Sequence, residues 1–381
     1  MSLTEFVIDF KKFARLSILA TALYFVAKAG LGYGIDYYKK TRPPIVVAPE
    51  ARFGLITPTK IDSIKLNQET GPIYILDTKT GKLPILPQRL KIYPAVTPTL
   101  SILAEKKVKV VATVFGFVRD PEKISFTEFK WSDLYFDRNK LVYSSRIFWG
   151  QAYNNFFSLR YDRNNPPAYY ATYRAPTGEV AKSTLLELLK QANLASEEIQ
   201  NSKIEIEYLN LIAGNYVSVA TSEESQFTKV SITRQIKDGS ELYNVASESP
   251  TSPVVYIILG QDSTMAVKVV EFKYFWHNFD FAQGSEYPTN NISNAWDKIQ
   301  NNQGLLVSLY TNDAGKYENY AGDPVTKLEI NEASIVYLES NNFQDLLEPY
   351  FSLSGKAKFA DGKEGAFVLY YNALSPEKLK Q

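Results

Sequence analysis

The sequence predicts an α+β protein in which an N-terminal transmembrane helix precedes an ectodomain of repeated helix-plus-antiparallel-sheet units. One apolar run near the N-terminus is long enough to cross a bilayer. Much of the remaining chain alternates apolar and polar residues in short runs, the pattern of half-buried strands, and amphipathic helical segments precede several of these runs. The aromatic content of 14%, with 26 Tyr and 22 Phe, favours sheet packing in such runs.

The apolar run extends from Leu16 to Ile35 and reads LSILATALYFVAKAGLGYGI. A transmembrane helix needs about 20 predominantly apolar residues, so this run is long enough to span the hydrocarbon core. Lys28 lies toward its C-terminal end, where the long side chain can carry its charge to the interface. We therefore expect an uncleaved anchor at residues 16–35, preceded by a short tail at residues 1–15.

Two other interpretations of this run stay open. It could be a cleaved secretory signal peptide, with basic residues before it and a small-x-small cleavage site at Ala27-Lys28-Ala29. It could also be a buried helix of a soluble protein. The anchor and the signal peptide both place the bulk of the chain outside the cytoplasm. We expect the N-terminus inside, although the basic residues on the two sides of the run are balanced and leave the orientation open.

The anchor interpretation predicts two kinds of contact. The side chains from Leu16 to Ile35 contact the lipid bilayer. Gly30 and Gly34 form a Gly-x-x-x-Gly pair, a spacing that lets two membrane helices approach closely. The pair predicts a helix-mediated homodimer, and flexible glycines at a helix end are the alternative.

Composition excludes several classes of function. Lys and Arg total 42 and Asp and Glu total 41, so the formal net charge of +1 supplies no global field for nucleic acid. The chain contains no Cys, which excludes disulfides, thiolate metal sites and cysteine nucleophiles. Its 381 residues suffice for roughly two or three domains.

Changes in composition and pattern divide the chain after the anchor. Residues 36–53 contain several prolines and predict an extended linker. We expect a first α+β unit at residues 54–175, a second at 176–285, a C-terminal one at 286–374 and a charged tail at 375–381.

The first unit is predicted to contain one helix among strands. Thr97, Pro98 and Thr99 supply cap-forming hydroxyls and an early proline, and Gly116 supplies a C-terminal stop. The expected apolar stripe consists of Leu100, Leu103, Val108, Val111, Ala112 and Phe115. Strands are expected at residues 72–77, 125–131, 140–147 and 155–161.

The later units show the same pattern of a helix followed by strands. A helix is expected at residues 179–192, followed by strands at 227–235, 254–259 and 265–276. The C-terminal unit is expected to contain a short helix at 292–300 and strands at 305–310, 328–337 and 350–359. Asp361-Gly362 predicts a hairpin turn before a last strand at 365–371.

An internal similarity suggests that one unit is repeated. Residues 116–134 align with residues 193–211 without a gap, and both segments follow an amphipathic helix. The matched positions include Ser125 with Ser202, Glu128 with Glu205, Trp131 with Tyr208 and Leu134 with Leu211. Duplication of one helix-plus-sheet unit explains the match. Two similar helix-to-strand joints that arose separately are the alternative.

The residues that show a family resemblance lie in the C-terminal unit. The residues that show it are Tyr287-Pro288, Ala295-Trp296, Gly304, the segment from Leu346 to Phe351, and Gly355. They resemble the C-terminal unit of YycH/YycI-type regulators, bacterial single-pass envelope proteins related in fold to PepSY domains. The similarity covers residues 227–374. It implies an extracytoplasmic domain that restrains or tunes a membrane partner, such as a sensor kinase, and it implies no catalytic residues.

The sequence offers few candidates for chemistry. His277 is the only histidine, which excludes His-rich zinc or iron sites, and no Gly-x-Ser-x-Gly elbow accompanies it. We interpret His277 as a strand residue among aromatics. The segment from Ser375 to Lys378 fits Ser-x-x-Lys, but it stands beside the C-terminus. The segment from Asp77 to Gly81 is similar to the aspartyl-phosphate loop of transport ATPases, but Thr78 replaces the lysine, and we expect a hairpin turn.

Glu205 and Glu207 are two apart on an expected strand and therefore point to one face. Such a pair suits Ca²⁺ or a glycosidase, whereas a solvated strand face is the simpler interpretation.

Together these observations predict a single-pass protein of the cytoplasmic membrane whose extracytoplasmic bulk binds another envelope protein. We expect no enzyme activity and no catalytic, cofactor-binding or metal-binding residues. One alternative is a surface module that binds peptide or glycan through exposed aromatic rings. Another is a hydrolase, which needs two carboxyl groups about 5–10 Å apart in a cleft.

Overall fold

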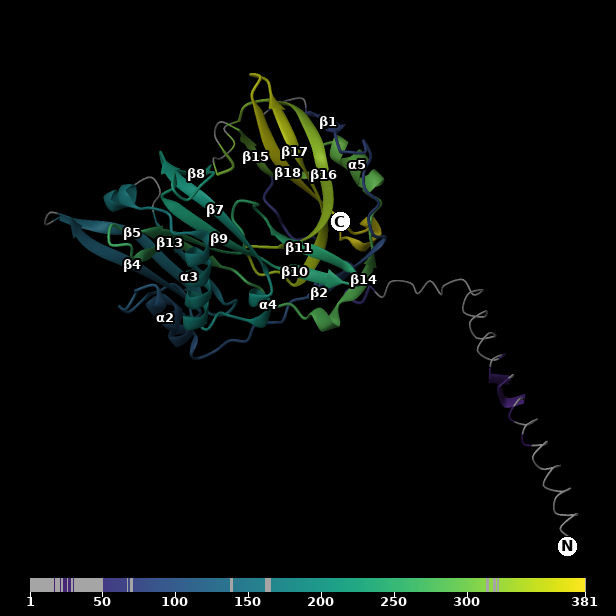
Figure 1. Cartoon of the computed structure of the whole chain (residues 1–381), viewed down its shortest axis with the longest axis horizontal. Helices are drawn as coiled ribbons and strands as arrows, with labels where there is room; N and C mark the ends of the chain where they lie inside the picture. Colours follow the sequence, from purple (N-terminus) through teal and green to yellow (C-terminus); the bar gives the residue numbers. More distant parts are fainter. Residues whose placement is uncertain are drawn as a thin grey trace, which may run out of the picture. The chain divides into compact units, whose positions relative to one another are not determined.

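The computed structural model describes residues 51–380 and a few residues nearer the N-terminus (Figure 1). Within 51–380 the exceptions are residues 67, 69–70, 138–139, 162–165, 313–314, 318–319 and 321, together with the side chains of residues 134–145. The chain divides into two compact units, Met1–Ala48 and Pro49–Gln381.

In the first unit the described residues are 17, 21, 23–25, 27–28 and 30, and all of them are helical. Thr21 Oγ1 donates a hydrogen bond to the carbonyl of Ser17 at 2.8 Å, as in one turn of an α-helix. No helix in the described part of the chain has both the length and the apolar character needed to cross a membrane. Most of the predicted anchor, Gly34 and most of the linker at 36–53 lie outside the described residues.

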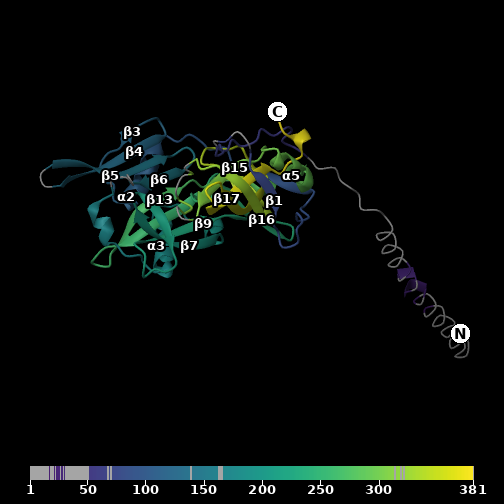
Figure 2. The same cartoon turned by 90° about the horizontal axis from the view of Figure 1, so that it is seen from above.

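The second unit is built mainly from strands with few helices, which confirms the α+β class. Its strands form two nine-stranded sheets, which lie toward opposite ends of the unit in Figures 1 and 2. Sheet 1 has the order β10 (Gln235–Asp238), β11 (Glu241–Ser247), β16 (Val325–Glu339), β17 (Leu346–Phe359), β18 (Glu364–Asn372) and β15 (Leu305–Thr311). Its other strands are β1 (Ile73–Leu76), parallel to β16, and β2 (Arg89–Pro94), which pairs with β17 and with β14 (Ser285–Pro288).

Sheet 2 is antiparallel throughout. Its order is β3 (Glu122–Lys123), β4 (Glu128–Asp137), β5 (Lys140–Gln151), β6 (Phe156–Arg160), β13 (Val267–Tyr274), β12 (Val255–Gln261), β9 (Phe227–Thr233), β7 (Lys203–Ile212) and β8 (Asn215–Val219). The helices are α2 (Ala104–Val114), α3 (Gly178–Gln191), α4 (Glu197–Gln200) and α5 (Ile292–Gln300), with 3-10 turns η1 (Ala168–Thr172), η2 (Phe281–Gln283) and η3 (Pro376–Lys378).

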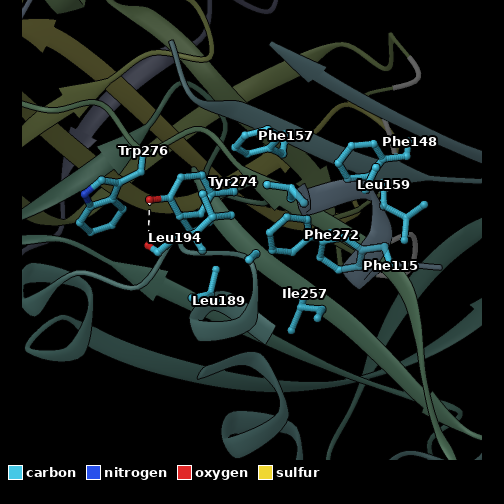
Figure 3. Close-up of a cluster of buried hydrophobic side chains, with 14 of the residues drawn as sticks. Phe115, Phe148, Phe157, Leu159, Leu189, Leu194, Ile257, Phe272, Tyr274 and Trp276 are labelled. Atoms are coloured by element: carbon cyan, nitrogen blue, oxygen red, sulfur yellow. Dashed lines mark hydrogen bonds between the residues drawn. The ribbon is translucent and has the colours of Figure 1, made fainter. Parts of the chain in front are cut away.

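Helices α2 and α3 pack on one face of sheet 2 and enclose an aromatic core (Figure 3). Phe115, which follows α2, contacts Phe272 of β13, with the two rings tilted and their centroids 4.5 Å apart. The hydroxyl of Tyr274 donates a hydrogen bond to the carbonyl of Leu194 at 3.2 Å, so this buried polar group is satisfied. Side chains alternate along a strand, so the residues adjacent to these core residues point to the opposite face of sheet 2.

The predicted helix after Thr97-Pro98-Thr99 begins later than expected. The amide of Val96 donates to the carbonyl of Asn278 at 2.8 Å, which holds the chain extended, and α2 begins only at Ala104. Leu100 and Leu103, expected on the apolar stripe, are 70% and 60% exposed. The local cap signal at Thr97 and Thr99 therefore does not set the start of this helix.

The structure gives no support to three separate repeated units. The segment predicted as the first unit contributes β1 and β2 to sheet 1 but β3 to β6 to sheet 2. The segment predicted as the second unit contributes β10 and β11 to sheet 1 and the central strands to sheet 2. The backbone groups of β6 pair with β13, and those of β11 pair with β16, so the hydrogen-bond ladders cross the expected boundaries.

Candidate functional site

A cleft of about 790 Å³ lies between the strands β7 to β9 of sheet 2 and the residues that follow β15 of sheet 1. We call it the inter-sheet cleft. Val230 and Ile232 of β9 point into the aromatic core, so Lys229 and Ser231 point to the opposite face and line the cleft. Glu205 of β7 also lines it. The alternation of side chains along the neighbouring strands β7 and β9 thus places a row of polar side chains in the inter-sheet cleft.

Lys229 is the least exposed charged group of this cleft, with 4% of its surface exposed. Its ammonium donates to the carbonyl of Thr251 at 2.7 Å and to the hydroxyl of Tyr317 at 3.0 Å. The rings of Tyr256 and Tyr317 lie 5.0 and 4.8 Å from it. Burial lowers the pKa of Lys229 to about 8, because these neutral partners replace water incompletely. Within the described ranges it forms no ion pair with a carboxylate.

Glu207 accepts the densest set of hydrogen bonds in the cleft. Its carboxylate lies 2.8 Å from the ammonium of Lys316 and accepts bonds from Ser218 and, at 2.5 Å, from Tyr317. Burial alone would raise the pKa of Glu207, but the bonds from Lys316, Ser218 and Tyr317 together hold it below the ordinary value. Glu207 therefore stays ionised at neutral pH.

The structure brings the two predicted carboxylates to the same cleft and gives each a cation. Glu205 lies 2.7 Å from Lys203, and Glu207 is held by Lys316. A glycosidase needs one carboxyl group that keeps its proton, with a raised pKa. The lowered pKa of Glu207 does not suit that role. In the part of the chain that the structure describes, no three histidine or acidic side chains are grouped as metal ligands.

A second buried lysine continues the polar face of sheet 2. Lys273 of β13 donates to Asn341 Oδ1 at 2.6 Å and to the carbonyl of Ser252 at 3.2 Å. Burial lowers its pKa to about 8, while Glu248 and Glu339 raise it. Lys229 and Lys273 bind adjacent carbonyls, those of Thr251 and Ser252. They therefore hold the connection between β11 and β12 against sheet 2.

Arg234, which belongs to no motif of the sequence, joins the two sheets. It lies between β9 of sheet 2 and β10 of sheet 1 and is completely buried. Its Nε lies 2.8 Å from Glu198 of α4, and its Nη1 lies 3.3 Å from Glu339 at the end of β16. Its guanidinium stacks on the ring of Trp276 at 4.0 Å. A single arginine after a strand has no spacing or motif that could reveal this arrangement.

His277 belongs to the same network and lies just after β13, not within the strand as predicted. It is buried among aromatic rings, and its ring centroid lies 4.8 Å from that of Phe156. One ring nitrogen lies 3.1 Å from Glu339 and the other 2.9 Å from the carbonyl of Asn342. Both nitrogens therefore have partners, and the backbone carbonyl of His277 accepts a bond from Arg234 at 2.6 Å.

The remaining motifs form local structure. The amide of Gly81 donates to the carbonyl of Thr78 at 2.9 Å in a turn, and Gly81 has a φ of +64°. The expected hairpin is wrong, because β1 before this turn pairs in parallel with β16. The Ser-x-x-Lys segment forms η3, where the carbonyl of Lys378 accepts a bond from the amide of Ile56. The structure does not bring either segment to the inter-sheet cleft.

Comparison with known proteins assigns no family to the chain. No family model matches it. No curated protein matches it either. Among solved structures it is similar to an uncharacterized protein from Eubacterium rectale ATCC 33656, at 10% sequence identity and a TM-score of 0.34. The similarity covers 80% of this chain and 87% of that one.

Proposed function

We propose that this protein is a membrane-anchored, extracytoplasmic binding or regulatory protein that acts through protein–protein contacts and not through catalysis. Residues 16–35 form its single transmembrane helix, and the body lies outside the cytoplasmic membrane. The resemblance of residues 227–374 to YycH/YycI-type and PepSY-like domains supports this location and role. The ungapped match of residues 116–134 with 193–211 supports a repeated helix-plus-sheet origin of the body.

One observation supports recognition over catalysis most directly. The carboxylates of the inter-sheet cleft are each held by a lysine, and Glu207 is kept ionised by three donors. Because its pKa is held below the ordinary value, the carboxylate of Glu207 is a poor proton donor near neutral pH. The carboxylates and their lysines instead present a fixed pattern of charge and hydrogen-bonding groups, which suits a polar partner surface.

The aromatic residues favour a protein partner over a glycan. Trp131 and Trp276 are buried. In the described part of the second unit, the exposed large aromatic side chains come from four separate places in the chain: Phe126, Tyr169, Phe281 and Phe343. A sugar- or peptide-stacking platform would need several rings on one concave face. Most aromatic side chains among the described residues are not exposed and serve internal packing, and the rings that line the inter-sheet cleft are Tyr310 and Tyr317.

Photo-crosslinking in native membranes tests the partner. A photoreactive residue at Asn312, on the rim of the inter-sheet cleft, is expected to capture a membrane or envelope protein. The same residue at Ile85, which is fully exposed and does not line the cleft, is the control position and is expected to give no such adduct. The absence of a discrete protein adduct at Asn312 would contradict the proposal.

A pair of variants shows whether the cleft itself is used. Ser218→Trp places a large ring in the cleft from an exposed position and is expected to reduce the Asn312 adduct at least tenfold, an effect of about 1.4 kcal/mol. Ser218→Ala removes the same hydrogen bond to Glu207 but leaves the cleft open, so its adduct is expected to stay near the wild-type level. Equal loss in both variants would indicate an effect on Glu207 and not on access.

A further inference from the structure

We propose that Glu348 is a proton-operated latch that holds the first segment of the folded body, residues 51–60, against sheet 1. We call this segment the strap. It begins within the last residues of the predicted linker, residues 36–53, so it is the part of the body on which a membrane anchor would pull. The inference rests on contacts within the second unit and does not depend on the proposed partner.

The strap is fastened at its start and in its middle by groups that do not titrate near neutral pH. The amide of Phe53 donates to the hydroxyl of Tyr287 at 2.8 Å, and the two rings are stacked with centroids 6.4 Å apart. The side chain of Ile56 is buried. Its amide and carbonyl each form a bond of 2.8 Å with the C-terminal segment, at Lys378 and Lys380.

The far end of the strap is held by a carboxyl group. Glu348 Oε1 of β17 accepts bonds from the amide of Thr59 at 3.2 Å and from its hydroxyl at 2.8 Å. Glu348 Oε2 accepts a bond from Asn372 of β18 at 3.1 Å. The hydroxyl of Tyr350 donates to the carbonyl of Thr59 at 3.4 Å. Every polar group of Thr59 therefore depends on this corner of sheet 1.

Glu348 is 2% exposed, and the ion pairs found among the described residues do not include it. Burying an ionised carboxylate without a cation is unfavourable, and protonation removes the charge. Glu348 and Thr59 line a cleft of about 460 Å³, which gives water a route to the carboxyl group. The charged side chains that face the same cleft are Lys60, Lys380 and Asp345.

Burial and hydrogen bonding act in opposite directions on the pKa of Glu348, and together they place it near neutral pH. Burial raises the pKa of Glu348 from 4.5 to about 7, although the bonds from Thr59 and Asn372 act in the opposite direction. The pKa of neighbouring Tyr350 is raised well above that range, so its phenol stays protonated. The folded-state pKa is above the unfolded value, so the stabilisation is complete below about pH 4.5 and is lost as pH rises through about 7. Release of the strap hydrates the ionised group, and it is therefore favoured above neutral pH.

Hydrogen exchange of the full-length protein in detergent micelles tests the latch. After correction for intrinsic exchange rates, the equilibrium constant for opening of the strap is expected to rise about thirtyfold between pH 5.5 and 8.5. This is the rise expected when the pKa of Glu348 falls from about 7 in the closed state to 4.5 in the open state. The paired strands β17 and β18 serve as the internal reference and are expected to keep their protection. A strap whose exchange does not change with pH would overturn the proposal.

Two variants separate the latch from general unfolding. Glu348→Gln cannot titrate, so its strap is expected to show no rise across this pH range. A wild-type-like rise in this variant would assign the effect to another group. Thr59→Val removes one bond that stabilises the ionised form, so the pH at which opening levels off is expected to move upward. This second variant keeps the test decisive if Glu348→Gln folds poorly, because an unchanged or lower plateau pH would contradict the latch.

Discussion

Replacement of Arg234 by methionine is expected to lower the free energy of unfolding by about 3–5 kcal/mol, the loss measured when one partner of a buried ion pair is removed. The guanidinium is completely buried between Glu198 and Glu339 and also donates to the carbonyl of His277. Without it, Glu339 remains as a fully buried carboxylate whose remaining bonds come from His277. The residue lies where the chain passes from one sheet to the other, so we also expect the sheets to unfold less cooperatively.

The effect of this substitution should depend on pH. Burial alone raises the pKa of Glu339, and Arg234 and His277 hold it below its ordinary value. Loss of Arg234 therefore raises that pKa, and the variant should recover stability as pH falls and Glu339 takes up a proton. Urea unfolding followed by circular dichroism and by tryptophan fluorescence measures both effects, since Trp276 stacks on Arg234.

Two controls define the outcome for Arg234. Lys237→Met on the exposed face of β10 removes a nearby cation and should change stability by no more than about 0.5 kcal/mol. Arg234→Met combined with Glu339→Gln should be more stable than the single variant, because the fully buried carboxylate of Glu339 is then replaced by a neutral amide. A loss below about 1 kcal/mol for Arg234→Met would show that the network does not join the sheets as described.

Substitution of Lys229 by methionine is expected to stabilise the protein at pH 7 by about 2 kcal/mol. Burial lowers the pKa of Lys229 from 10.5 to about 8, and a shift of this size corresponds to roughly 3 kcal/mol against the charged form in the folded protein. The lost bonds to Thr251 and Tyr317 offset part of this gain, at about 1 kcal/mol or less for each. Unfolding midpoints in urea measure the difference.

The advantage of Lys229→Met should disappear as pH rises. The folded-state pKa is below the unfolded one, so the unfolded chain binds more protons between about pH 8 and 10.5, and wild-type stability rises across that window. The gap between variant and wild type is therefore expected to close by roughly 2 kcal/mol between pH 7 and 9.5. Lys203→Met, which breaks an exposed pair with Glu205, should change stability by no more than about 1 kcal/mol at either pH. A constant gap would show that Lys229 is not desolvated.

This result would bear on function as well as on stability. A lysine that lowers stability yet lines a cleft is the kind of residue that recognition can retain. We therefore expect Lys229→Met to fold well and to lose the crosslink from Asn312. Retention of the crosslink in a stable variant would limit Lys229 to its structural contacts with Thr251 and Tyr317.

Several elements could be predicted from local patterns. The helix expected at residues 292–300 is α5, Ile292–Gln300, and the one expected at 179–192 is α3, Gly178–Gln191. The hairpin at Asp361-Gly362 is present, and Gly362 has the positive φ, +85°, that such a turn requires. The apolar spacing of a helix and the demands of a tight turn act over a few residues, so they can be read along the chain.

The long-range pairing could not be read in this way. The bond between Thr59 and Glu348 joins positions 289 residues apart. Arg234, between β9 and β10, reaches Glu339 at the end of β16. Alternation placed Glu205 and Glu207 on one face, and Lys203 of the same strand pairs with Glu205, but Lys316 reaches Glu207 only because β7 and the residues after β15 meet. Likewise, the amide of Val96 pairs with the carbonyl of Asn278, a partner 182 residues away along the chain. The backbone groups along the edge of a strand can pair with any other strand, so the sequence of one strand does not specify its partner. The order of the sheets, the burial of charged groups and the position of the strap are therefore decided only when distant segments pack together.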